Sequence, residues 1–197
     1  MTLSIFNHQT RSRPKAMRNI GYITNQDNIK YENTEEKMRD YHFIFDFILK
    51  GVKQLQSNLN GIRYEFVFDD PVEVYLKTPI MTFIGDNQGL DKLCMKYSNK
   101  LHANCLCRYC DCLTDHADQS TPNYSYIKQD DVRKLIEQKK DKLKQISIYN
   151  VDNPLFNLQY CDNIRGIFGA TPWDLVHGLQ HGLHDYALIE CFLSKTR

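Results

Sequence analysis

The sequence predicts an α/β fold, in which a small mixed sheet with flanking helices precedes a cysteine-rich insertion and a long C-terminal helix. Three observations predict it. Residues 62–68 largely alternate between apolar and polar side chains, as a half-buried strand does. Residues 80–84 are nearly all apolar, which is typical of a central strand. Between positions 33 and 55, apolar side chains recur every three or four residues, as on one face of a helix.

The elements of the first half follow in order. Short apolar pieces at 3–6 and 20–23 predict two short strands, and Asn33 with Glu36 predicts a capping box at the start of the first helix. The core face expected for that helix is Met38, Tyr41, Phe45, Ile48, Leu49, Val52 and Leu55. Strands are then expected at 62–68, 72–76 and 80–84, followed by a short helix at 90–97.

The second half is read as mainly helical around a cysteine-rich stretch. Residues 99–126 are aperiodic, residues 130–146 read as one lysine-rich amphipathic helix, and residues 149–170 are expected to be irregular. Thr171-Pro172 has the chemistry of an N-cap and first-turn proline. The helix that they open has the expected core face Leu175, Val176, Leu179, Leu183, Tyr186, Ile189 and Leu193.

Composition limits the classes of function. The 25 Lys and Arg residues against 24 Asp and Glu give a net charge of +1, so nucleic-acid binding would need a local patch or a metal. No apolar run is long enough to span a membrane, and the polar start lacks the apolar centre of a signal peptide, so we expect a soluble, intracellular protein without a membrane partner. Seven cysteines in that setting favour metal ligands or free thiols over disulfides.

The pair Cys107 and Cys110 has the spacing with which two thiolates bind one tetrahedral Zn²⁺. Cys105 and Cys112 are further candidate ligands, whereas Cys94 is expected to be buried in a helix. Two other interpretations stay open, a redox-active pair and unliganded thiols. A redox pair normally lies at a strand-to-helix turn, and these cysteines lie in a loop, so zinc is the favoured interpretation.

Three histidines, His177, His181 and His184, form one stripe opposite the apolar face of the last helix. His177 and His181 are four residues apart and could share one metal ion. The alternative is a solvated helix face that is rich in histidine, and it is the favoured interpretation for His181 and His184.

Asp86 follows the apolar run at 80–84 and lies between Gly85 and Gly89. A carboxylate at the end of a central strand is where open α/β sheets place functional groups, and such carboxylates can hold Mg²⁺ for phosphoryl transfer. The alternative role is a turn former or helix cap. Asp91 and Asp115 are weaker candidates of the same kind.

Five segments in this order resemble one protein family. They are residues 11–23 (RSRPKAMRNIGYI), Asp40-Tyr41-His42, Phe83-Ile84-Gly85-Asp86 with Leu93-Cys94, Leu106-Cys107-Arg108-Tyr109-Cys110, and residues 171–179 (TPWDLVHGL). The family is the eukaryotic cut-and-paste DNA transposases of the Plavaka and Kyakuja–Dileera–Zisupton type, relatives of the CACTA-like enzymes. The resemblance covers nearly the whole chain.

This resemblance implies an RNase H-like core that uses three acidic residues and two metal ions. Asp86 matches the second acidic residue, and Cys107, Cys110 and His177 match a zinc-stabilised insertion. His181 falls where related proteins often carry lysine. The first catalytic Asp and the third, a Glu, have no counterpart here, because no acid precedes Asp27 and Glu190 lies on the apolar side of its helix.

The fold expected from the resemblance is therefore an incomplete RNase H-like core in residues 1–98, with a Cys/His-rich insertion and helical region in residues 99–197. We expect a nuclear, transposase-derived fragment with structural zinc and without catalysis of its own; Mg²⁺ would bind only in an intact parent. DNA, the partner of the parent family, would bind weakly or not at all, and no small-molecule substrate is evident. The alternatives are a zinc-stabilised protein-binding adaptor and a metal-dependent nuclease or hydrolase that uses Asp86.

Overall fold

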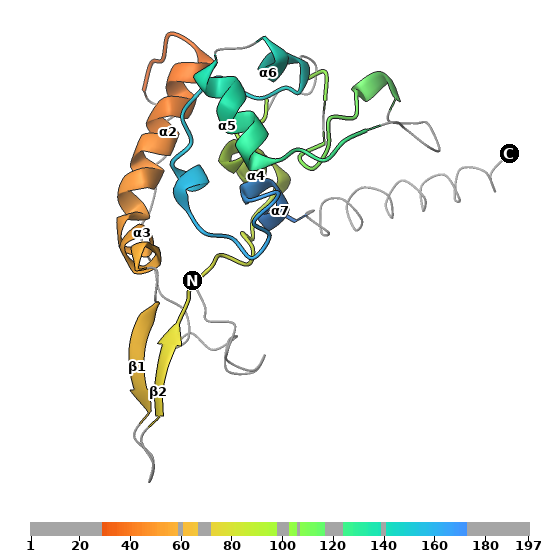
Figure 1. Ribbon diagram of the computed structural model, residues 1–197. Coiled ribbons are helices and arrows are strands. Elements are labelled where there is room, and N and C mark those ends of the chain that lie inside the picture. The colour runs from red at the N-terminus through yellow and green to blue at the C-terminus, as the bar shows by residue number, and fades with distance from the viewer. Residues whose placement is uncertain are drawn as a thin grey trace, which may run out of the picture.

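The computed structural model describes residues 29–58, 61–66, 72–97, 103–105, 107–116, 124–138 and 141–172. These residues form a mixed α/β structure with six α-helices, two short 3-10 helices and one two-stranded antiparallel sheet (Figure 1). The strands expected at 3–6 and 20–23, and the helix expected after Pro172, lie outside the described residues.

The predicted first helix is present as α2 (Thr34–Ile48) and α3 (Lys50–Ser57). Its capping is confirmed, since the Asn33 side chain accepts a 2.9 Å hydrogen bond from the Glu36 backbone N–H. The Glu36 carboxylate reaches back to the N–H of Glu32, at 2.7 Å, one residue before the cap. Leu49 ends α2, begins α3 and is buried, so the two helices form one long edge of the molecule (Figure 1).

The hairpin of β1 (Ile62–Phe66) and β2 (Val72–Leu76) confirms two of the predicted strands. The strands pair antiparallel, from Ile62 opposite Leu76 to Phe66 opposite Val72. Gly61, at φ +86°, leads into β1 where a Cβ would collide with the Leu76 carbonyl, so glycine is required there. The hairpin points away from the helices (Figure 1).

The prediction of a central strand at 80–84 is wrong. Ile80 makes one parallel bridge, donating from its N–H to the Gln159 carbonyl (2.8 Å) and accepting from the Cys161 N–H (3.0 Å). Phe83 donates to the Ala170 carbonyl instead, at 2.6 Å. The backbone of this segment is thus hydrogen-bonded to two separate partners rather than to a neighbouring strand. Its apolar side chains are divided between the core and the solvent, and Ile84 is 93% exposed.

The single helix predicted at 130–146 is also wrong. The structure has α5 (Gln129–Glu137) and α6 (Lys142–Gln145), with Gln138 as the C-cap of α5. Residues 137–142 are six consecutive polar residues, so a continuous helix would have no apolar side chain to bury at this point. The short helix expected at 90–97 is present as α4 (Asn87–Leu93), which starts three residues earlier and ends four residues earlier than predicted. Cys94 is fully buried, as predicted.

The core is centred on the segment that the sequence predicts to be irregular. Residues 149–170 contain only the 3-10 helix η4 (Pro154–Asn157) and the short α7 (Ile167–Ala170). Their buried apolar side chains are Val151, Leu155, Phe156, Leu158, Tyr160, Ile167, Phe168 and Ala170. The segment threads between α2 on one side and α4 and α5 on the other (Figure 1), and η4 contacts α2. One apolar cluster therefore joins residues from 38–95 and 127–170.

Within the described part of the chain, no helix is both long enough and apolar enough to cross a membrane.

Candidate functional site

The cysteine loop, by which we mean Cys105 and residues 107–112, is held in place by short stretches of backbone hydrogen bonding. The carbonyl of Tyr109 accepts from the Ile127 N–H at 2.8 Å, and the N–H of Asp111 donates to the Ser125 carbonyl at 3.0 Å. Cys110 lies between these two bonds and forms an antiparallel bridge with Tyr126. The described residues of this loop therefore have a defined backbone, although none of them belongs to a helix or strand.

Backbone amides point at the two sulfur atoms of the predicted zinc pair. The Tyr109 N–H donates to Cys107 Sγ at 3.4 Å. Burial raises the pKa of the Cys110 thiol to about 12, the Cys112 backbone N–H opposes this rise, and the neighbouring Cys107 side chain adds to it. A divalent cation bound by these two side chains would strongly favour the thiolates.

The two residues between the cysteines anchor the loop to distant segments. Arg108, only 6% exposed, donates through Nη1 to Asp91 Oδ1 (2.7 Å) and through Nη2 to Asn87 Oδ1 (3.1 Å) and to the Pro172 carbonyl (3.2 Å). The Tyr109 hydroxyl donates to the Thr171 carbonyl at 2.5 Å. Sequence reasoning missed both roles, because the spacing that identifies the cysteines says nothing of the residues between them.

Asp86 is the N-cap of α4. Its Oδ1 accepts a 2.7 Å hydrogen bond from the Gly89 N–H, and the residue is exposed. The weaker candidates do not gather around it: Asp91 is engaged with Arg108, and Asp115 lies in the 3-10 helix η3 (Thr114–His116). Among the residues that the structure describes, no three His, Cys, Asp or Glu side chains are arranged to hold a metal ion.

His177 and His181 lie outside the described residues. Pro172, where the described chain stops, is bound to Arg108 of the cysteine loop, and His177 follows it by five residues. A tetrahedral zinc site at Cys107 and Cys110 would need two further ligands.

A buried lysine lies beside the loop, and the sequence offers no signal for it. Lys96, 2% exposed, donates to the Ile146 carbonyl at 2.6 Å and to Cys105 Sγ at 3.5 Å. Burial lowers the pKa of Lys96, which the Cys105 thiol partly opposes. The Cys105 thiol itself donates to the Cys110 carbonyl at 3.1 Å. Cys105 is therefore engaged in holding the loop together.

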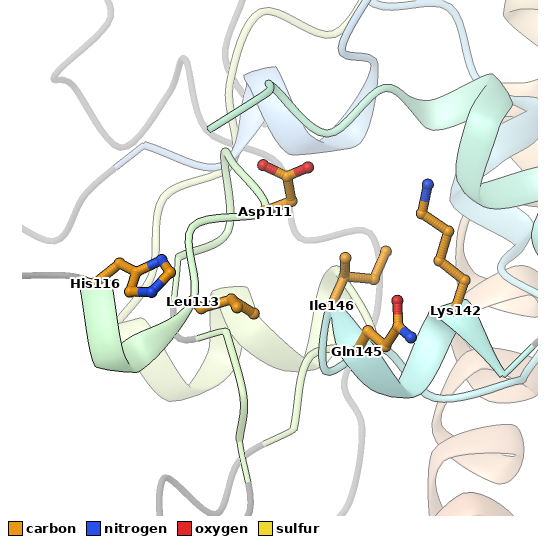
Figure 2. A pocket seen from close by; sticks show the side chains of 6 residues that line it. All are labelled: Asp111, Leu113, His116, Lys142, Gln145 and Ile146. Atoms are coloured by element: carbon orange, nitrogen blue, oxygen red, sulfur yellow. The ribbon is translucent and has the colours of Figure 1, made fainter. Parts of the chain in front are cut away.

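A cavity of about 350 Å³ lies between the end of the cysteine loop and α6 (Figure 2). Its lining consists of Asp111, Leu113, His116, Lys142, Gln145 and Ile146. The Asp111 carboxylate is already bound by the Ser125 N–H at 2.6 Å, and the cavity is open to solvent. Cys107 and Cys110 do not line it, so it is separate from the candidate metal site.

No protein-family model, curated protein or solved structure matches this chain.

Proposed function

We propose that this chain is a fragment derived from a DNA transposase of the Plavaka and Kyakuja–Dileera–Zisupton type, with a structural zinc site at the cysteine loop and no catalysis of its own. The observation that supports it is the meeting of three distant motifs. Arg108 binds Asp91 of α4, which Asp86 caps, and Arg108 and Tyr109 bind Pro172 and Thr171. Segments of the family resemblance that are more than 60 residues apart thus form one hydrogen-bonded cluster.

The zinc part of the proposal follows from how this cluster holds the loop. Arg108 and Tyr109 are fixed by these hydrogen bonds, and the backbone that carries Cys107 and Cys110 is fixed with them, which supports a metal site there. The segment leading to His177 begins at the same cluster. We assign Cys107, Cys110 and His177 as ligands, with His181, Cys105 or Cys112 as the fourth. The incomplete RNase H-like core and the nuclear location belong to the same proposal and rest on the resemblance.

The roles of two acidic residues support the proposed lack of catalysis. In-line phosphoryl transfer needs two metal ions held by several carboxylates. Asp86 caps a helix and Asp91 neutralises Arg108, so the acids nearest the family's catalytic position have structural roles.

A protein-binding adaptor stabilised by zinc is the second candidate. The exposed apolar side chains of Met81 and Ile84 favour it, because they lie just before Asp86 where a partner could cover them. The salt dependence of binding distinguishes these two candidate functions. DNA binding weakens steeply as the salt concentration rises, whereas binding through buried apolar side chains does not.

Metal analysis of the purified chain tests the proposal. We expect about one equivalent of zinc, because four-ligand structural sites bind tightly at neutral pH. Cys107→Ser with Cys110→Ser should lose it, and the exposed Cys161→Ser is the matched control that should keep it. Less than about half an equivalent in the unaltered chain contradicts the zinc site. Plasmid nicking with Mg²⁺ or Mn²⁺ that disappears in Asp86→Asn contradicts the lack of catalysis.

A further inference from the structure

The polar face of the β1–β2 hairpin carries a carboxylate without a cation. The exposed side chains that share this face are Arg63, Glu65, Glu73 and Tyr75. Glu65 lies directly opposite Glu73, and like charges in that position destabilise a pair of strands. Glu73 is neutralised by Arg63, at 2.9 Å, and accepts a 2.7 Å hydrogen bond from the Tyr75 hydroxyl. In the described part of the chain, no cation is paired with Glu65.

The outer edge of β1 lies next to Glu65. β2 occupies one edge of β1, and the described residues add no third strand to this sheet. In an antiparallel pair, about half of the backbone N–H and C=O groups of each strand point away from the partner and can pair with a further strand. The hairpin extends away from the helices (Figure 1), and no described helix packs extensively against either strand. A strand added at this edge would place its own side chains beside Glu65.

We propose that β1 pairs antiparallel with β1 of a second copy of this chain, about a two-fold axis at position 64. In this register, Arg63 lies opposite the partner's Glu65, and Glu65 lies opposite the partner's Arg63. Each Glu65 thereby gains the cation that it lacks. Arg63 can serve both carboxylates, because its ion pair with Glu73 is made through Nη2 and the guanidinium has further donors.

The charge pattern of β1 selects this register. The same face is kept only when the pairing moves by two residues. Moving it one way places Glu65 opposite the partner's Glu65, and moving it the other way places Arg63 opposite the partner's Arg63. Both neighbouring registers are therefore disfavoured by like charges.

The second copy also adds to the apolar face of the hairpin. Ile62, Val74 and Leu76 share that face and are half-buried. A two-stranded hairpin alone is marginally stable in water, whereas three or more strands with an apolar face are not. Antiparallel pairing places the helices of the two copies at opposite ends of the joint four-stranded sheet. The inference is independent of the zinc site and of the family resemblance.

Sedimentation equilibrium of the full chain, over a range of protein concentrations, tests the proposal. We expect a concentration-dependent dimer. Glu65→Arg should raise its dissociation constant at least about tenfold, because two pairs of arginines then face each other. The same change places a cation opposite Glu73 within the hairpin, so it should not unfold the strands. Lys77→Glu, at an exposed position just after β2, is the matched control and should leave the dimer unchanged.

Charge exchange decides whether β1 forms the interface. Arg63→Glu with Glu65→Arg in one chain keeps opposite charges in the paired register, so this double variant should dimerise like the unaltered chain. A mixture of the two single variants should form a heterodimer, although neither dimerises alone.

Two results with the simplest proteins overturn the proposal: an unaltered chain that is monomeric at all concentrations, and a dimer that Glu65→Arg leaves intact. If Arg63→Glu alone fails to fold, Glu65→Arg and the double variant decide. A folded double variant that stays monomeric overturns the proposal as well.

Discussion

The guanidinium of Arg108 lies 2.7 Å from the carboxylate of Asp91, across 17 residues of sequence, and is almost completely shielded from water. Through this pair the cysteine loop is bonded to α4, and through the other donors of Arg108 it is bonded to the segment that leads to the histidines. The pair therefore determines where the two cysteines lie relative to the rest of the molecule.

Replacing Arg108 should destabilise the fold strongly. Arg108→Met leaves Asp91 and two backbone carbonyls without their donor in a mostly buried place, which we expect to cost about 2–4 kcal/mol of unfolding free energy. Arg63→Met is the control, because Arg63 pairs with Glu73 at 2.9 Å in a well-exposed position, and its loss should cost less than about 1 kcal/mol. Urea denaturation measures both, and similar values for the two variants would contradict the structural role of Arg108.

Acid should weaken the fold through His42. The ring is buried, and desolvation lowers its pKa to about 4, which the backbone of Lys92 opposes only in part. The unfolded chain, with a pKa near 6.5, therefore binds the proton more readily than the folded chain. The stability is fully present above about pH 6.5 and falls as the pH drops toward 4, by up to roughly 3 kcal/mol.

The measurement is urea unfolding at several pH values between 7.5 and 4.5 for the unaltered chain and for His42→Leu. The variant should show a flatter pH dependence over that interval, because it lacks the buried imidazole. Equal slopes for both proteins would mean that other groups cause the acid sensitivity.

Two glycine-to-alanine changes should have opposite signs. Gly166, at φ +57°, precedes α7 where a Cβ would overlap the Gln129 side chain, which accepts from the Ile167 N–H at 3.0 Å. Gly166→Ala should therefore cost about 2 kcal/mol or more. Gly51 lies inside α3 with open space around a built Cβ, so Gly51→Ala should stabilise by up to about 1 kcal/mol. Thermal unfolding distinguishes the two, and a neutral Gly166→Ala would show that the Gln129 contact is dispensable.

Asp86 should behave as a helix cap. Asn caps as well as Asp, so Asp86→Asn should change stability little, whereas Asp86→Ala should cost about 1 kcal/mol because the Gly89 N–H loses its acceptor. Chemical denaturation of the two variants provides the comparison. Equal losses in both would indicate that the charge of Asp86, rather than its capping oxygen, is what matters.

The sequence by itself determined the local elements and one half of the candidate site. Helical period and the Asn33 cap locate α2 and α3, and alternation followed by a turn locates the hairpin of β1 and β2, because these signals act between residues a few positions apart. The spacing of Cys107 and Cys110 identifies the pair for the same reason.

Only the tertiary structure decided which polar residues are internal and where the core lies. Gln56, buried in α3, donates to the Thr78 carbonyl (2.7 Å) and accepts from the Gln159 N–H (2.8 Å), and Arg108 joins three segments. Residues 149–170 form much of the core without any period, since their backbone groups are satisfied by partners such as Ile80 and Gln129 far away in the sequence. A buried polar group requires a partner at hydrogen-bond distance, and in an irregular chain that partner is fixed by packing rather than by spacing.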